Sequence, residues 1–211
     1  MKLTNADVVT ILLQISDRMI EQANYLSELD AVAGDAEHGI NMSKGFAALK
    51  ALLPEMEGNA PFETLMETGN VIMSKTGGSA GVLYGTFFLE AAKACRGVDA
   101  LDAHVIANML RGALNGMMKR GGAIPGDKTM IDTIYPAVEE FEKATAEGRS
   151  LQECSALCTK AAKDGMERTK EMIAKKGRAS YVGEKSMGHQ DPGATSMYYV
   201  FEQAEAYISS K

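Results

Sequence analysis

Three carboxylates and an imidazole are crowded into nine residues of the stretch LDAVAGDAEHGINM, which runs from Leu29 to Met42. They belong to Asp30, Asp35, Glu37 and His38. Spacings of five and two residues do not stack carboxylates on a helix face. On a glycine-punctuated loop, alternate carboxylates can turn inward onto one cation, because Mg²⁺ and Ca²⁺ require oxygen ligands. The residues alone leave a second interpretation open, which is acidic capping of a helix start.

The same stretch leads into an apolar, helix-like segment. His38, Gly39 and Asn41 would therefore lie at a helix N-terminus, where free N–H groups can meet an anion. An EF-hand is excluded, since the D-x-[DN]-x-[DN]-G pattern and its distal glutamate are absent.

A second glycine-rich turn, KTGGSAGVLYGTFF, also precedes a helical pattern. Its glycines allow the backbone N–H groups of Ser79 and Ala80 to point at phosphate oxygens. It is not a Walker A loop, because no Gly-Lys-[Ser/Thr] follows, and no strand precedes it as a dinucleotide fingerprint requires. Small residues at this place are equally compatible with close packing of two helices.

The third segment, RGGAIPGDKTMIDTIYP, contains a Pro-Gly turn, and Asp127 is a predicted N-cap. Met130 suits the flat face of a nucleobase, although methionine more often fills a core. The fourth, GRASYVGEKSMGHQDPGATS, is long and polar, which is typical of a functional or mobile loop. Arg178 is a candidate phosphate clamp there if the loop faces a nucleotide, and otherwise a solvated surface residue.

Composition excludes several classes of protein. The chain has 211 residues, 45% of them hydrophobic and 24% charged, which predicts one soluble globular domain spanning residues 1–211. The formal charge of −6 and the lack of a Lys/Arg run argue against direct nucleic-acid binding. No signal peptide or membrane span is recognisable, so we expect a cytoplasmic protein without a membrane partner. The three cysteines, an odd number, are expected to be buried and reduced.

Apolar residues recur at helical spacing in eight segments, and no segment alternates as a strand does. The segments are 6–29, 40–53, 60–75, 81–96, 101–120, 128–148, 150–177 and 193–210. Ser150 is a further predicted N-cap, and Pro136 predicts a kink or a late helix start. The four unusual segments, 30–41, 76–81, 121–129 and 177–193, are all odd-numbered connections. In an up-down arrangement they converge on one rim, where a ligand site would form.

Together the four segments resemble the nucleotide-binding L subunit of bacterial dihydroxyacetone kinases. The motifs that carry the resemblance are GDAEHGINM, GGSAGVLYGT, PGDKTMID and GRASYVGEKSMGHQDPGATS, in the family's order. The resemblance implies an all-α, eight-helix antiparallel up-down barrel or bundle, with ADP and two Mg²⁺ ions at one rim. The family's metal ligands fall on Asp30, Asp35 and Glu37. Its nucleotide contacts fall on His38, Gly39, Ile40, Asn41, Ser79, Ala80, Gly121, Met130, Arg178, Asp191, Pro192 and Gly193.

Glu37 departs from the family pattern, which usually has aspartate at this position. Glutamate keeps the charge and adds a methylene group. Because Mg²⁺ demands near-ideal octahedral geometry, we expect metal binding to survive with altered geometry.

In length the chain resembles a free-standing subunit of the phosphotransferase-system type. ATP-dependent members of the family fuse this domain to a K domain in a much longer chain. The resemblance then implies that ADP/ATP stays bound as a coenzyme. A phosphohistidine protein, the M subunit, rephosphorylates it, and the phosphoryl group passes to dihydroxyacetone or a similar small ketose on a K subunit. No residue of the chain need be phosphorylated. On this reading His38 is a ligand contact, His189 packs its loop, and His104 is structural.

Two other functions are alternatives to the phosphotransferase subunit. Some relatives of this family act as non-catalytic partners of a transcription regulator, and intact motifs are compatible with that role. The nucleotide-binding head of fatty-acid kinases has a similar first loop but usually threonine in place of His38. The GHQDPGATS motif and the short chain argue against the latter.

Overall fold

The computed structural model describes residues 1–211, and almost all of its regular structure is helical. The only strand-like pairing is a bridge between Leu3 and Leu101. Three short 3-10 segments accompany the α-helices: η1 (Leu53–Met56), η2 (Thr169–Glu171) and η3 (Arg178–Ser186). The nine α-helices are α1 (Asn5–Glu21), α2 (Ala23–Ala31), α3 (His38–Leu52), α4 (Pro61–Lys75), α5 (Gly78–Ala94), α6 (Ala103–Gly121), α7 (Ile131–Ala146), α8 (Leu151–Arg168) and α9 (Pro192–Ser209).

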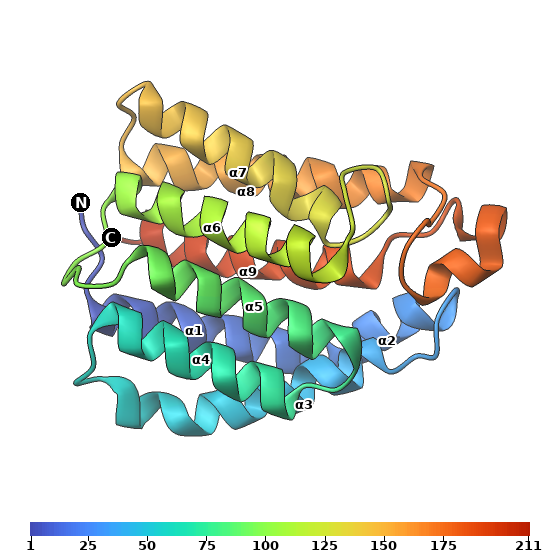
Figure 1. The fold of residues 1–211 in the computed structure, drawn as a ribbon, viewed down its shortest axis with the longest axis horizontal. Coiled ribbons are helices and arrows are strands. Elements are labelled where there is room, and N and C mark those ends of the chain that lie inside the picture. The colour runs from blue at the N-terminus through green and yellow to red at the C-terminus, as the bar shows by residue number, and fades with distance from the viewer.

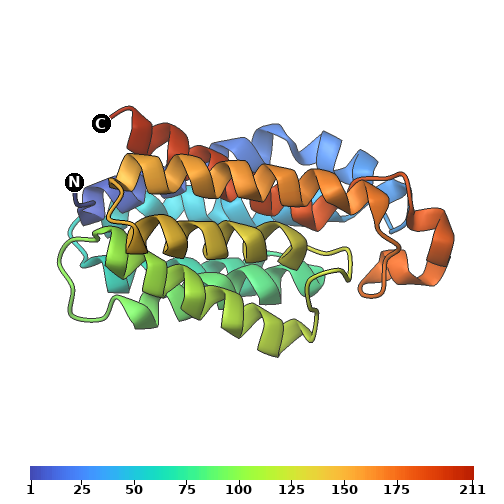
Figure 2. The same cartoon turned by 90° about the horizontal axis from the view of Figure 1, so that it is seen from above.

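The helices form a closed antiparallel barrel (Figure 1). From α3 to α9 each helix packs against the next one in the chain, and the ring closes where α9 and α3 both pack against α1. The view from above shows the same two-ended cylinder, with both chain termini at one end (Figure 2). The predicted all-α, eight-helix barrel is therefore confirmed in its architecture.

The helix count differs by one because the first predicted helix is broken. Gln22 lies at the break with φ −91° and ψ 9°, so α1 and α2 are separate helices. In Figure 1, α2 extends along the barrel away from the chain termini. The break therefore lets the end of α2 carry Asp30 to the rim.

The predicted seventh helix is too long, because α8 ends at Arg168 rather than near residue 177. The carbonyl of Thr169 accepts from Lys128 Nζ at 2.7 Å, and the carbonyl of Lys170 accepts the N–H of Gly188 at 2.7 Å. Carbonyls past the end of α8 are thus satisfied by groups from elsewhere, so tertiary contacts override a locally helical pattern. The predicted polar loop at 177–193 contains the 3-10 segment η3.

The predicted caps have mixed outcomes. Ser150 is confirmed as the N-cap of α8, where its side chain accepts the N–H of Glu153. Asp127 is not an N-cap, because α7 begins at Ile131; its carboxylate instead accepts the N–H of Ile124 at 3.0 Å and closes a turn. Pro136 lies inside α7, so the alternative of a late helix start is wrong.

One continuous core fills the barrel, and its largest fully buried side chains include Tyr84 and Phe46. The prediction for the cysteines is confirmed, since Cys95, Cys154 and Cys158 are buried and free. None of the helices is long and apolar enough to cross a membrane.

Candidate functional site

The four unusual segments meet at the end of the barrel opposite the termini and enclose a cavity of about 680 Å³. This volume falls within the range of small-molecule sites. The predicted convergence on one rim is therefore confirmed. Of the predicted site residues, the cavity wall contains Asp30, Asp35, Glu37, His38, Asn41, Ser79, Ala80, Gly121, Met130, Arg178, Asp191, Pro192 and Gly193.

Gly39 and Ile40 do not line the cavity. A Cβ on Gly39 would lie 1.8 Å from the carbonyl oxygen of Ala23, so this glycine allows α3 to approach α2. The Ile40 side chain points into solvent, with 64% of its surface exposed.

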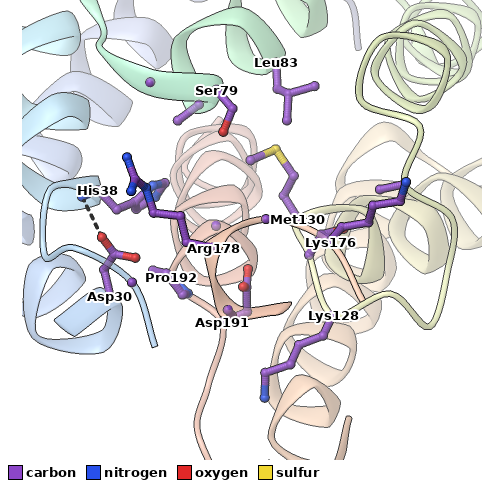
Figure 3. Close-up of a pocket in the computed structure, with 18 of the residues that line it drawn as sticks. Asp30, His38, Ser79, Leu83, Lys128, Met130, Lys176, Arg178, Asp191 and Pro192 are labelled. Atoms are coloured by element: carbon purple, nitrogen blue, oxygen red, sulfur yellow. Dashed lines mark hydrogen bonds between the residues drawn. The ribbon is translucent and has the colours of Figure 1, made fainter. Parts of the chain in front are cut away.

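The acidic stretch is split between a helix and a loop. Asp30 lies in the last turn of α2, while Asp35 and Glu37 lie in the loop before α3. One carboxylate oxygen of Asp30 accepts the backbone N–H of His38 at 3.1 Å, which ties the two ends of the loop together (Figure 3). Ala36 has a φ of 61°, in the left-handed region, so this short loop is sharply turned.

The carboxylates repel one another. Burial raises the pKa of Asp30, and the nearby negative charge of Asp35 raises it further. Two adjacent carboxylates of this kind favour a bound cation, and oxygen donors suit Mg²⁺. No three acidic, histidine or cysteine side chains are drawn together tightly enough to form a metal site. Asp35 instead forms an ion pair with Arg178 at 2.8 Å. The carboxylate oxygens are suitable ligands for Mg²⁺, but Arg178 occupies one of those of Asp35.

His38 is fixed by a buried hydrogen-bond chain. Its Nε2 lies 2.9 Å from the hydroxyl of Ser196, which lies 2.7 Å from the hydroxyl of Tyr84. Burial lowers the pKa of His38 to about 4, so the imidazole is neutral at pH 7. Tyr84 and Ser196 were not singled out from the sequence, because their helical spacing resembles that of ordinary core residues.

The N-terminus of α5 opens into the cavity without a side-chain cap. Ser79 and Ala80 lie in its first turn rather than in a loop, so their N–H groups belong to the unsatisfied end of the helix. Gly78 has a φ of 67°, and a Cβ on Gly77 would lie 2.5 Å from the amide oxygen of Asn41. Glycines are thus required for the turn that aims this helix end at the cavity.

The N-terminus of α9 faces the same space. Asp191 caps it by accepting the N–H of Ala194 at 2.7 Å, and burial raises the pKa of Asp191 to about 7. With the first residues of α3 and α5 also in the wall, three helix N-termini point at one cavity. Their combined dipoles favour an anion there.

One part of the cavity wall is apolar. Leu83 of α5 and Met117 of α6 lie in it beside Gly121, Ala123 and Met130. Figure 3 shows the Met130 thioether and Leu83 on the same side of the cavity as Ser79. Sequence reasoning identified Met130 from its loop but missed Leu83 and Met117, because nothing distinguishes them from core residues in a helical pattern. It also missed Lys128 and Lys176, which line the cavity.

The fold and the cavity define a class: helical-barrel proteins with an anion site and acidic groups at one rim. Residues 32–206 match the DAK2 domain, and the chain belongs to this family. It is 37% identical over 202 residues, 96% of each chain, to the ADP-binding subunit DhaL of the PEP-dependent dihydroxyacetone kinase of Escherichia coli. It is also 37% identical, over 88% of this chain and 87% of the relative, to subunit DhaL of dihydroxyacetone kinase 1 of Listeria innocua.

Solved structures agree with these similarities. The dihydroxyacetone kinase of C. freundii superposes with a TM-score of 0.75 at 27% identity, over 96% of this chain and 34% of that one. Its complex with AMP-PNP and Mg²⁺ superposes with a TM-score of 0.75 at 26% identity, over 98% and 34%. The chain thus spans about a third of those longer kinases. The resemblance drawn from the four motifs is confirmed.

Proposed function

We propose that this chain is the ADP- and Mg²⁺-binding subunit of a PEP-dependent dihydroxyacetone kinase. In this role it passes a phosphoryl group from a phosphohistidine M-type subunit, by way of bound ADP/ATP, to dihydroxyacetone or a similar small ketose on a K-type subunit. The observation that carries the proposal is the uncapped N-terminus of α5, which faces the same cavity as Asp30 and Asp35. Similarity to ADP-binding subunits over 96% of the chain supports it.

The residues divide into a polar and an apolar set. Asp30, Asp35 and Glu37 would hold the metal, two ions being expected. When bound, Mg²⁺ neutralises charge on the phosphates and orients them for transfer.

The backbone N–H groups of Ser79 and Ala80 would hold phosphate oxygens, as would those near His38 and Asn41. Gly121 and Met130 would contact the base. Arg178 would clamp a phosphate with its guanidinium group. The N-terminus of α9, with its N-cap Asp191 and first residues Pro192 and Gly193, would complete the anion-binding wall.

His38 would serve as a contact and not as a phosphocarrier. Its Nε2 is engaged by the Ser196 hydroxyl, and its imidazole is held in one orientation. The chain itself would therefore position groups and neutralise charge without forming a covalent intermediate.

The coenzyme part of the proposal is tested by purifying the protein gently in Mg²⁺-containing buffer and then denaturing it. We expect about one adenine nucleotide released per chain, identified by mass spectrometry. Protein that releases none, and that binds no added ADP with Mg²⁺, would contradict the proposal.

The transfer part is tested with purified K- and M-type partners, phosphoenolpyruvate and the general phosphotransferase proteins. We expect turnover of dihydroxyacetone only when all three subunits are present. No turnover, together with tight binding to a transcription regulator, would instead favour a non-catalytic regulatory partner.

A further inference from the structure

Lys128, in the loop between α6 and α7, has a buried ammonium group. Only 3% of the residue is exposed, which is rare for lysine unless its charge is satisfied. Its Nζ donates to the carbonyls of Thr169 at 2.7 Å, Ser186 at 2.6 Å and His189 at 2.6 Å, with that of Met172 at 3.2 Å. Three N–H donors face four acceptors, so this lysine has no donor left for a ligand.

The four carbonyls come from separate parts of the chain. Thr169 and Met172 follow the end of α8, Ser186 ends η3, and His189 precedes α9. An ammonium group at the C-terminal end of a helix is favoured by the helix dipole. Through one side chain, Lys128 therefore ties both ends of the segment 172–191, here called the outer segment, to the α6–α7 loop.

The outer segment projects beyond the barrel (Figure 1), and its hydrogen bonds to other parts of the chain lie near its base. At its base, the N–H of Lys175 donates to the carbonyl of Asp127 at 3.1 Å, that of Gly188 to the carbonyl of Lys170 at 2.7 Å, and that of Asp191 to the Thr169 hydroxyl at 3.1 Å. Within the segment, the N–H of Ala174 donates to the Ser186 hydroxyl at 2.9 Å. Farther out, Tyr181 is 90% exposed. The position of the outer part therefore depends on how its base is held.

Arg178 lies at the start of η3 and reaches across the mouth of the cavity to Asp35, at 2.8 Å. In Figure 3 its side chain extends toward His38, whereas the ammonium group of Lys128 points away from the centre of the cavity. The two cations thus have different roles. Arg178 faces the cavity, whereas all the donors of Lys128 bind backbone carbonyls at the base of the segment that carries Arg178.

We propose that Lys128 is a positioning residue that holds the outer segment in the orientation that places Arg178 over the cavity. The effect on nucleotide binding rests on the function proposed above, whereas the effect on the segment does not. Lys128 acts through Arg178 and does not itself contact the ligand.

The first test is hydrogen exchange of the ligand-free protein, followed by mass spectrometry of peptides from the outer segment. Lys128→Met removes the ammonium and leaves the carbonyls without a donor. We expect exchange in residues 172–190 to accelerate about tenfold or more, with helices α4 and α5 unchanged. The control is Lys175→Met, since Lys175 is exposed in the same segment and its side chain has no partner. Unchanged exchange in Lys128→Met would overturn the proposal.

The second test is a double-mutant cycle on the dissociation rate of ADP in Mg²⁺, using Lys128→Met and Arg178→Gln. If Lys128 acts through Arg178, each single change accelerates dissociation by about tenfold, and the double variant is no faster than the faster single variant. A lysine that merely stabilised the fold would lower the melting temperature and leave the effect of Arg178→Gln undiminished. Multiplying effects in the cycle would therefore refute the positioning role.

If Lys128→Met does not fold, a second variant allows both experiments to be carried out. Lys128→Gln keeps two N–H donors for the carbonyl cluster, so the same exchange experiment and cycle can be run with it. If the unaltered protein binds no adenine nucleotide, the proposed function fails, yet the ligand-free exchange result still decides whether Lys128 anchors the outer segment.

Discussion

The two ends of the barrel differ in how completely side chains cap the helices that begin there. At the end with the chain termini, connections are closed by side-chain caps: Ser150 and Asp102 cap α8 and α6, and Thr4 with Asp7 forms a capping box on α1. At the cavity end, Asp191 caps α9, but α5 begins without a side-chain cap, and so does α3, whose N-cap residue is Glu37. The starts of α3 and α5 therefore leave backbone N–H groups available at the cavity end, whereas side chains cap α1, α6 and α8 at the other end.

The acidic side chains also differ between the two ends of the barrel. At the closed end, Asp7 is only 4% exposed but accepts hydrogen bonds from Tyr207 at 2.5 Å, from Thr4, and from Lys211. At the cavity end, Asp30 and Asp35 lie close enough to raise the pKa of Asp30. The buried carboxylate at the closed end therefore stabilises the fold through its hydrogen bonds. The carboxylates at the cavity end remain available to a ligand.

We expect the largest effect from neutralising Asp30. With Asp30→Asn we expect Mg²⁺-dependent ADP binding and phosphoryl transfer to fall by about 100-fold or more, because a metal ligand is lost. We expect the melting temperature to stay level or rise slightly, since burial disfavours the ionised carboxylate that is removed. Calorimetric titration and thermal unfolding measure the two effects.

The matched control is Asp164→Asn, which removes an exposed carboxylate of α8 that does not line the cavity. It should change neither ADP binding nor stability appreciably. A large loss of stability in Asp30→Asn would contradict the assignment of this residue to function.

Asp7→Asn should have the reverse pattern. Burial alone would raise the pKa of Asp7, but hydrogen bonds from Lys211, Tyr207 and Thr4 outweigh it and hold that pKa well below its usual range. We expect a loss of about 2–3 kcal/mol in the free energy of unfolding at pH 7, with ADP binding unchanged. Chemical denaturation at several pH values measures this. Weakened ADP binding in a folded Asp7→Asn protein would show that the ends are coupled.

The pH dependence has a definite sign. Because the folded-state pKa of Asp7 is depressed, its stabilisation is complete above the unfolded pKa of about 4 and is lost as the pH falls further. The unaltered protein should therefore lose more stability below pH 4 than Asp7→Asn does.

The same contrast explains how much was predictable from the sequence. Helix periodicity and loop parity were sufficient for the barrel and for the convergence of four loops, because both depend on local pattern. The end of α8 was misplaced, because Lys128 and Ser186 satisfy groups in residues 169–174 from elsewhere in the chain. Such long-range hydrogen bonds have no signature in local periodicity.

The site was predictable where residues stood out from their surroundings. Asp35 and Glu37 stood out as acids between two glycines, with Asp30 five residues before Asp35. By contrast, Leu83 and Tyr84 lie on a helix whose inner side reaches both core and cavity. The interpretation of Asp127 as an N-cap failed because its carboxylate closes the preceding turn instead.

Arg178 links the outer segment to a carboxylate of the cavity, that of Asp35. With Arg178→Gln we expect the dissociation of ADP in Mg²⁺ to accelerate about tenfold, since a charge-assisted hydrogen bond is lost. Binding of Mg²⁺ alone should be unchanged or at most about fivefold tighter, because Asp35 is freed from a largely exposed ion pair. Stopped-flow release and Mg²⁺ titration separate the two. Weaker binding of Mg²⁺ alone would contradict competition between Arg178 and the metal for Asp35.

Glu37 is expected to give the smallest effect. It occupies the N-cap position of α3, but its side chain accepts no cap hydrogen bond. In Glu37→Asp the shorter carboxylate suits octahedral Mg²⁺ geometry better, so we expect Mg²⁺ to bind a few-fold more tightly. Aspartate is also a preferred N-cap, which should add about 0.5–1 kcal/mol to stability without metal.

Glu37→Asn separates these two contributions, because asparagine caps a helix as well as aspartate does but carries no charge. We expect Glu37→Asn to gain the metal-free stability and to lose Mg²⁺ affinity. Thermal unfolding in chelator and titration with Mg²⁺ provide the two measurements. If Glu37→Asp leaves the Mg²⁺ affinity and transfer rate unchanged, the additional methylene of Glu37 has no consequence for the metal. The residue then belongs with the helix start and not with the carboxylates of the cavity.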